Sequence, residues 1–363
     1  MSPELEQAYA ESYRPFFQGG GAITEEVTKL RPWRVFLEIN SGCNLKCPSC
    51  TKGNTSAING LKYEHQTGFM DEDLMERILD KIASENPDAI VFTYGNSEPW
   101  LNPRLPECLA SIKRRGLHPQ FSTNLNYVQR VDETLAAQPD MIIISLSGFT
   151  QEIYERGHDG GNIDKVKAHM RIVAEANDRA KPRINIAVNF HVYLDNEHEI
   201  APMKEYAEGL GLGFFTSFAR AISMENTIQY VRHKDPEATP FEVQEGRPDW
   251  NHVFPPVTDN YLKTMARLHI PPEQAIEMYK DLPKSHLCPV GAGSLFTFIR
   301  HDGKTQLCAC SADRRITLGD YLDTSADELR ESRVGHSVCQ QCLKYRLGPY
   351  YMIVTRNAWV SPE

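Results

Sequence analysis

The feature that most constrains this chain is a loop with three cysteines, Cys43, Cys47 and Cys50, which directly follows an apolar alternating stretch at residues 34–40. The alternation predicts a strand, so the cysteines lie in the loop at its end. Thiolates are soft ligands that suit iron, and three of them can hold three corners of a cubane iron–sulfur cluster. The fourth iron would then have no protein ligand, and a small chelating molecule could bind there.

A zinc knuckle and a disulfide pair are the simpler explanations of such a loop. Structural zinc needs four ligands, usually in two spaced pairs, and no histidine or fourth cysteine lies near Cys50. The N-terminus lacks the basic and then apolar segment of a signal peptide, although the chain has nine cysteines. We therefore expect a cytoplasmic protein whose thiols serve metals or catalysis rather than disulfides.

The composition limits the partners. With 48 acidic and 39 basic residues the formal net charge is −9, which argues against a broad nucleic-acid-binding surface. No apolar run approaches the roughly 20 residues of a membrane span. We expect neither DNA nor a membrane as a partner.

Strand-like and helix-like segments alternate over the first two thirds of the chain. The expected strands are 34–40, 89–94, 118–122, 141–145, 183–193 and 213–218, and the expected helices are 71–83, 104–115, 127–137, 163–178 and 199–210. Repeated strand–helix units predict an α/β fold with a parallel sheet, here a partial (β/α)6 barrel. In such barrels the chemistry lies at the C-terminal ends of the strands.

Three polar motifs and one arginine lie at or beyond these strand ends. They are Gly95-Asn96-Ser97-Glu98-Pro99, Ser122-Thr123-Asn124, Ser145-Leu146-Ser147-Gly148 and, eleven residues after Ser145, Arg156. Taken singly, each motif is explained as a turn or helix N-cap, and Arg156 as a solvated surface charge. Their placement after successive strands favours a shared binding site.

The cysteine loop and these motifs resemble the radical S-adenosylmethionine (SAM) superfamily, over roughly residues 34–345. The resemblance implies that SAM binds the open iron through its amino and carboxylate groups. Reduction then cleaves SAM to methionine and a 5′-deoxyadenosyl radical, which abstracts a hydrogen from the substrate.

The resemblance also implies roles for the motif residues. Gly95, Asn96, Ser97 and Glu98 match the Gly-Gly-Glu-Pro element, with Glu98 accepting hydrogen bonds from the SAM ammonium. Ser122 and Asn124 match the Thr-Asn element, Ser145 would face the SAM ribose or carboxylate, and Arg156 would contact the carboxylate. The chain departs from the family pattern at Ser49, often aromatic in relatives, at Asn96-Ser97 in place of the second glycine, and at Ser147 in place of an acid.

A second cysteine set follows near the C-terminus. Cys288, Cys308, Cys339 and Cys342 have the spacing C-x14-G-x4-C with a later C-x2-C, and the intervening residues predict a hairpin around an Asp-Gly turn and a helix near 325–332. The pattern resembles the twitch form of the SPASM extension. That resemblance implies an auxiliary 4Fe-4S cluster closed by four thiolates, which passes or stores electrons; structural zinc is the alternative.

Two cysteines remain. Cys108 lies in a helical pattern and is most simply a small buried hydrophobe. Cys310 alternates with Cys308 along the predicted strand and so points to the opposite face. It is either a bystander or, as in epimerases of this superfamily, a catalytic hydrogen donor to a substrate radical.

We expect four parts: a leader at 1–33, the radical SAM barrel at 34–220, an insertion at 221–285 and a twitch/SPASM-like α+β domain at 286–363. The insertion is rich in proline and charge, and is equally well explained as a surface excursion or as a lid over the barrel mouth.

The function expected from this resemblance is that of a radical SAM oxidoreductase acting on a small polar substrate such as an amino sugar, cyclitol or nucleoside. The substrate preference rests on the lack of a separate peptide-binding leader domain. An electron donor such as flavodoxin or ferredoxin would supply the first electron, and the auxiliary cluster would take one from the substrate radical. The alternatives are crosslinking or epimerisation of a ribosomally made peptide, with Cys310 as donor, and a non-catalytic Fe-S or zinc-binding protein.

Overall fold

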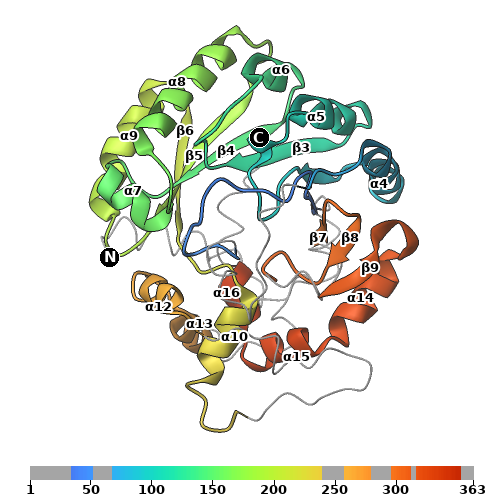
Figure 1. Cartoon of the computed structure of the whole chain (residues 1–363), viewed down its shortest axis with the longest axis vertical. Coiled ribbons are helices and arrows are strands. Elements are labelled where there is room, and N and C mark those ends of the chain that lie inside the picture. Colours follow the sequence, from blue (N-terminus) through green and yellow to red (C-terminus); the bar gives the residue numbers. More distant parts are fainter. Residues whose placement is uncertain (1–33, 52–67, 239–256, 279–295, 312–315, 353–363) are drawn as a thin grey trace.

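The computed structural model describes residues 34–51, 68–238, 257–278, 296–311 and 316–352. Within them a single sheet has the strand order β6-β5-β4-β3-β2-β1-β7-β8-β9. Helices lie along the outer side of its first six strands (Figure 1). No helix of the described residues is long and apolar enough to span a membrane.

The first six strands run parallel and in sequence order, which confirms the expected partial barrel. They are β1 (Arg34–Leu37), β2 (Ile90–Phe92), β3 (His118–Thr123), β4 (Met141–Leu146), β5 (Asn185–Val192) and β6 (Gly213–Phe218). The helices between them are α4 (Glu72–Glu85), α5 (Leu105–Arg114), α6 (Val131–Ala136), α7 (Gln151–Gly157), α8 (Ile163–Arg179) and α9 (Ile200–Gly209), with the 3-10 turns η2 (Pro99–Leu101) and η3 (Glu197–Glu199).

Helix α4 forms for the reasons seen in its sequence. The side chain of Asp71 accepts a hydrogen bond from the Leu74 N–H (3.1 Å) and caps the first turn. Its apolar residues recur at helical spacing, and Ile78, Leu79 and Ile82 are fully buried against the sheet.

The expected helix at 127–137 is too long at its N-terminal end, because α6 begins only at Val131. Arg130 just before it adopts a left-handed backbone (φ 49°), and Leu125 does the same (φ 53°). A residue in this conformation cannot continue an α-helix. The chain from Asn124 to Arg130 is therefore a loop at the end of β3.

The C-terminal strands extend the barrel sheet. β7 (Phe296–Ile299) pairs parallel with β1 and antiparallel with β8 (Lys304–Gln306), and β9 (Thr317–Asp320) follows. The expected Asp-Gly turn joins β7 to β8, and Gly303 supplies the positive φ (79°) that the turn requires. The hairpin is predicted by the sequence, whereas β9 is not.

A second apolar core lies beside the barrel, between helices from two distant parts of the sequence (Figure 1). The helices that supply it are α10 (Met224–Arg232), α13 (Pro272–Met278), α15 (Ser337–Lys344) and α16 (Leu347–Met352). Helix α12 (Asp259–Met265) belongs to a separate apolar cluster, and α14 (Ala326–Val334) packs Leu329 against the barrel core. Helices α10 and α13 of the predicted insertion thus pack against the C-terminal ones.

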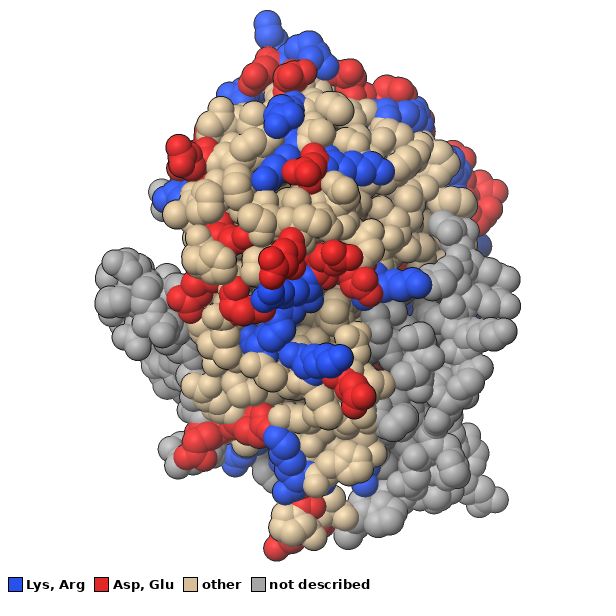
Figure 2. All heavy atoms as spheres, turned by 60° about the vertical axis from the view of Figure 1, so that its left-hand side comes forward, with Lys and Arg blue, Asp and Glu red and all other residues tan. Residues whose placement is uncertain are grey.

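Charged side chains are mixed on the face drawn in Figure 2, where Lys and Arg neighbour Asp and Glu. Basic and acidic side chains also form ion pairs at the surface, for example Arg130 with Glu107. Neither sign forms a continuous field on that face.

Lys81 of α4 joins the barrel to the 3-10 turn η5 (Tyr321–Asp323). Its ammonium donates to the backbone carbonyls of Tyr321 (2.6 Å) and Thr324 (2.8 Å) and lies 4.7 Å from the centre of the Tyr321 ring. The side chain is only 20% exposed, so little water competes for these contacts.

We predict that Lys81→Met lowers the free energy of unfolding by about 2 kcal/mol, because charge-assisted hydrogen bonds are lost. Urea unfolding measures the change. Lys165→Met, at an exposed position of α8, is the control. Equal stability of the two variants would show that the contacts of Lys81 do not stabilise the fold.

Candidate active site

The loop of Cys43, Cys47 and Cys50 lies at the C-terminal edge of the sheet, where the sequence placed it. All three side chains are half-buried thiols rather than disulfides. The loop is held by the neighbouring loops: the Lys46 N–H donates to the carbonyl of Asp159 (3.0 Å), and the Glu98 N–H donates to that of Gly42 (2.9 Å).

Electrostatics favour a positive centre at this loop. Burial raises the pKa of Cys47 well above its usual value, and the nearby sulfurs of Cys50 and Cys43 raise it further. The three sulfurs are therefore close enough to repel one another as thiolates. Soft, cationic iron would relieve this repulsion, so the donor set fits an iron–sulfur cluster.

Glu98 fastens the loop after β2 to the loop after β3. Its carboxylate is 1% exposed and accepts hydrogen bonds from the Thr123 hydroxyl (2.7 Å), the Asn124 N–H (2.8 Å) and the Trp100 N–H (3.2 Å). Burial raises its pKa to about 7, although the three hydrogen bonds oppose the shift. In this structure the carboxylate is thus engaged internally rather than turned towards a ligand.

The rest of the Gly95–Ser97 turn is closely packed but not fully paired. A Cβ on Gly95 would lie 2.3 Å from the ring of Phe298, which is itself buried, so only glycine fits there. The hydroxyl of Ser97 is buried and has no hydrogen-bond partner within the described residues. This hydroxyl is therefore available for a hydrogen bond to a ligand or a water molecule.

Asn124 reaches the cysteine loop directly. Its amide nitrogen lies 3.7 Å from the sulfur of Cys43 and 2.9 Å from the side-chain oxygen of Asn44. On the neighbouring strands the hydroxyls of Ser122 and Ser145 bond to each other (2.7 Å). The structure therefore brings Glu98 and Asn124 to the cysteine loop and places the two serines side by side.

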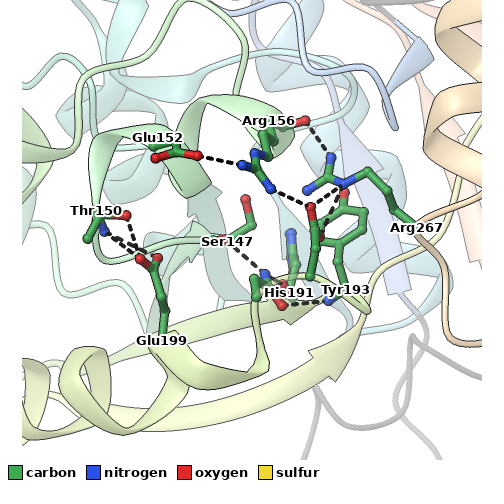
Figure 3. A network of polar contacts seen from close by, with 10 residues as sticks. Ser147, Thr150, Glu152, Arg156, His191, Tyr193, Glu199 and Arg267 are labelled. Atoms are coloured by element: carbon green, nitrogen blue, oxygen red, sulfur yellow. Dashed lines mark hydrogen bonds and ion pairs between the residues drawn. The ribbon is translucent and has the colours of Figure 1, made fainter.

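Arg156 is engaged elsewhere, as Figure 3 shows. Its guanidinium pairs with Glu152 (2.6 Å) and with Asp195 (3.1 Å), and its side chain is 41% exposed. Asp195 also binds Arg267 (3.0 Å), whose guanidinium lies 4.3 Å from the centre of the Tyr193 ring. This network fixes the chain near α12 to the loop after β5.

The inner face of the sheet divides into two halves. Alternate residues of each strand face the outer helices, so the others face inward. On β7, β1 and β2 these are aromatic: the rings of Phe36, Phe92 and Phe298 stack on one another. On β3 to β6 they are a mixture: the polar residues are Gln120, Ser122, Ser145, Asn189, His191 and Ser217, and the apolar ones include Ile143, Ala187 and Phe215.

Sequence reasoning missed a pair of histidines in the polar half. His158 is buried, bonds to the Ser147 hydroxyl (2.8 Å), and stacks between Tyr154 and His191. Burial, and then the neighbouring His191, lowers the pKa of His158 to about 3, and burial with Arg220 lowers that of His191 to about 4. Both rings are therefore neutral at physiological pH.

A chain of hydrogen bonds assigns the tautomer of His191. The Ser217 hydroxyl donates to the Asn189 oxygen (2.7 Å), so the Asn189 amide nitrogen is the donor to His191 Nε2 (3.3 Å). The ring hydrogen is left on Nδ1. The period-two pattern of polar residues at Asn189 and His191 in the predicted strand is the signal that could have found this residue.

The second cysteine set lies in the second apolar core. Cys310 and Cys342 are buried there, and Cys308 and Cys339 pack against the same cluster; Cys288 lies outside the described residues. Neither these cysteines nor those of the first loop form, within the described residues, a group of three side chains placed to hold a single metal ion.

The expected orientation of Cys310 is wrong. β8 ends at Gln306, and Cys308 to Ser311 form a turn in which the Ser311 N–H donates to the Cys308 carbonyl (3.1 Å). The Cys310 N–H approaches the Cys308 sulfur (3.4 Å), and a hydrogen bond between the two thiols raises the pKa of Cys308 and lowers that of Cys310. The two thiols are thus neighbours, because strand alternation stops where the strand ends.

Residues 222–224 join the two cysteine sets. The Ile222 N–H donates to the carbonyl of Ser49 (2.7 Å), and the Met224 N–H donates to that of Cys310 (2.8 Å). Two short hydrogen bonds within three residues thus tie the first cysteine loop to the second.

Comparison with known proteins agrees with this architecture. Residues 37–207 match the family model described as Radical SAM superfamily, so the resemblance seen in the sequence is confirmed there. The tungsten-containing aldehyde ferredoxin oxidoreductase cofactor-modifying protein of Pyrococcus furiosus is 27% identical over 184 residues, which are 49% of this chain and 49% of that protein. The chain thus spans about half the length of the curated relative it matches.

Solved structures of other proteins resemble this chain, among them the following two. Streptococcus suis SuiB bound to its precursor peptide SuiA has a TM-score of 0.50 at 12% identity, covering 93% of this chain and 71% of SuiB. Native anSMEcpe with bound AdoMet has a TM-score of 0.49 at 16% identity, covering 88% and 89%. At 12% identity the likeness to SuiB concerns the fold alone.

We predict that Glu98 gives the stability of the protein a distinctive pH dependence. From about pH 4.5 to about pH 7 the folded protein keeps the Glu98 proton while the unfolded chain has lost it, so the free energy of unfolding falls as pH rises. The free energy of unfolding of the wild type minus that of Glu98→Gln should fall by about 3 kcal/mol over this pH interval and then stay constant.

Urea unfolding at several pH values measures this difference. Glu107→Gln is the contrasting variant: the hydrogen bond from Arg130 holds the pKa of Glu107 below its usual value, so its stabilisation is lost as pH falls. Parallel pH curves for wild type and Glu98→Gln would contradict the prediction.

Proposed function

We propose that this chain, which carries a radical SAM domain at residues 37–207, is an enzyme that binds a 4Fe-4S cluster at Cys43, Cys47 and Cys50 and SAM beside it. The contact of the Asn124 amide with the Cys43 sulfur carries the proposal, because it joins the SAM-type motifs to the thiols. A cluster held there with SAM supplies a 5′-deoxyadenosyl radical that takes a hydrogen from the substrate.

The polar residues around the loop would bind and orient SAM. The unpaired hydroxyl of Ser97 and the backbone of the Gly95–Ser97 turn suit its polar groups, since Glu98 is already bonded internally. Glu98 is then a positioning residue rather than a SAM ligand. Ser122 and Ser145 form a hydroxyl pair that suits the ribose or carboxylate.

Arg156 contacts the SAM carboxylate in this proposal only by exchanging a partner. Its pair with Glu152 is exposed and therefore weak, so this exchange costs little. The pair with Asp195 also holds Arg267 and is the firmer of the two.

The inner face supports a small polar substrate of the amino sugar, cyclitol or nucleoside type. The polar half offers hydroxyl, amide and imidazole groups, and His191 can donate its Nδ1–H to a substrate oxygen. The neutral state of His191 suits hydrogen bonding to uncharged groups. The aromatic rings opposite would cover the apolar faces of such a ligand.

The second cysteine set would hold the auxiliary 4Fe-4S cluster, with the spacing-based ligands Cys288, Cys308, Cys339 and Cys342. Loss of a hydrogen atom leaves a substrate radical, and loss of one further electron and one proton completes a two-electron oxidation. The hydrogen bonds of residues 222–224 to both cysteine loops support a fixed separation between the two redox centres. An electron donor such as flavodoxin or ferredoxin would reduce the first one.

The test of the first cluster is alanine substitution of Cys43, Cys47 and Cys50, singly and together. Reconstituted, reduced protein should then release no deoxyadenosine from SAM, because fewer than three thiolates hold the cluster poorly. Cys108→Ala, in the buried face of α5, is the control and should cleave SAM. Deoxyadenosine from the triple variant would overturn the proposal.

The test of the SAM site is binding affinity. Removing either hydroxyl in Ser122→Ala or Ser145→Ala should weaken SAM binding about fivefold to tenfold, as expected for the loss of one hydrogen bond. Titration calorimetry on reconstituted protein measures the affinity. Ser111→Ala, a buried serine on α5 outside the barrel interior, should bind SAM like wild type; unchanged affinity in the first two variants would remove both serines from the site.

A further inference from the structure

The loop after β3 contains a residue in an unfavourable backbone conformation. Leu125 is left-handed (φ 53°), although its side chain is fully buried and carries a Cβ that disfavours this region. Residues of this kind cluster at functional sites, where the contacts around them fix the chain. The contacts that hold Leu125 therefore indicate which neighbouring group the turn serves to place.

Side chains on both sides of Leu125 hold the turn. The Thr123 hydroxyl accepts a hydrogen bond from the Leu125 N–H (2.9 Å), and the Asn124 side-chain oxygen accepts one from the Asn126 N–H (2.9 Å). The Nδ1–H of His169, on α8, donates to the Leu125 carbonyl (2.8 Å). Both backbone groups of the left-handed residue are thus paired, and the Asn124 side chain is fixed in one orientation.

That orientation turns the amide nitrogen of Asn124 towards the first cysteine loop. A backbone N–H can bond only to the amide oxygen, so the two amide hydrogens lie on the other side. They are directed to the Cys43 sulfur (3.7 Å) and to the side-chain oxygen of Asn44 (2.9 Å), the next residue of the loop. The amide of Asn124 therefore has no hydrogen left to donate to a ligand.

Asn126 completes the support of the turn. It is 5% exposed, and its amide nitrogen donates to the Asn124 carbonyl (3.1 Å) and to the Tyr154 hydroxyl (2.7 Å). Its amide oxygen accepts a hydrogen bond from the Asn162 N–H (2.8 Å). These bonds leave the side chain a single arrangement. Asn126 thus acts on Cys43 only through Asn124, as a positioning residue.

We propose that the Asn124 amide, held by Asn126, donates a hydrogen bond to the Cys43 thiolate of the bound cluster and thereby raises the reduction potential of that cluster. The inference rests on the proposed function, which places the cluster at this loop. One-electron reduction adds negative charge to the cluster and its thiolates. A hydrogen bond to one thiolate therefore stabilises the reduced state more than the oxidised state.

The experiment measures the reduction potential of the first cluster in the full, reconstituted chain without SAM. A redox titration is followed by spin resonance, and the signal of the first cluster is the part that is absent when Cys43, Cys47 and Cys50 are all changed to alanine. In Asn124→Ala the ratio of reduced to oxidised cluster at a fixed potential should fall about tenfold, as expected for the loss of one hydrogen bond. This ratio equals a shift of about 59 mV for a one-electron couple.

Two further variants separate positioning from stability. Asn126→Ala should also lower the potential, because Asn124 keeps its amide but loses its support. Asn177→Ala is the matched control: Asn177 is also buried, and its amide bonds to the carbonyl (2.9 Å) and N–H (2.7 Å) of Ile184. Since Ile184 directly precedes β5, this site lies at the opposite edge of the sheet from the cysteine loop. The control should lower stability and leave the potential at its wild-type value.

A wild-type potential in Asn124→Ala would overturn the proposal and leave the proposed function intact. Weaker SAM binding at that unchanged potential would identify Asn124 as a SAM ligand instead. Should Asn124→Ala hold no cluster, Asn126→Ala decides in the same way, because it retains the donor group. Absence of the first cluster from the reconstituted wild-type protein would overturn both the inference and the proposed function.

Discussion

The buried carboxylate of Glu98 is the interaction on which the geometry of the site depends. It gathers donors from its own turn and from the end of β3, while the Glu98 N–H and carbonyl are tied to Gly42 and to the Asn40 side chain. The loops after β1, β2 and β3 thus converge on one residue. Because a buried carboxylate is costly unless its hydrogen bonds are complete, the three loops have little freedom to move independently.

A small number of hydrogen bonds also joins the barrel to the second apolar core. Short backbone segments make the connections: residues 222–224 bind both cysteine loops, and Lys81 of α4 reaches the carbonyls beside η5. Around this frame the inner face keeps an aromatic half and a polar half. Stacked aromatic rings therefore lie on one side of the interior, and hydrogen-bonding groups interspersed with apolar side chains lie on the other.

Much of the barrel was predictable from the sequence, because its strands and helices have clear periodicity. Asp71 marked the start of α4, and the Asp-Gly pair marked the turn between β7 and β8. The predicted secondary structure was wrong where the backbone conformation of one residue or a tertiary contact determines where an element begins or ends. Arg130 delays α6 by its left-handed backbone, and Cys308–Ser311 turn where a strand was expected.

The site was predictable as a set of residues but less so as a set of roles. The sequence motifs predicted that Glu98 and Asn124 lie near the cysteine loop. They did not predict that the Glu98 carboxylate accepts hydrogen bonds from Thr123 and Asn124 at the end of β3. His158 and His191 lie 33 positions apart and meet only through the packing of the fold, so no local pattern pairs them.

The strand β7, from the C-terminal part of the chain, pairs parallel with β1. During synthesis on the ribosome the free edge of β1 has no partner on that side until the C-terminal hairpin has emerged. Until then this edge is open to pairing with strands of other chains.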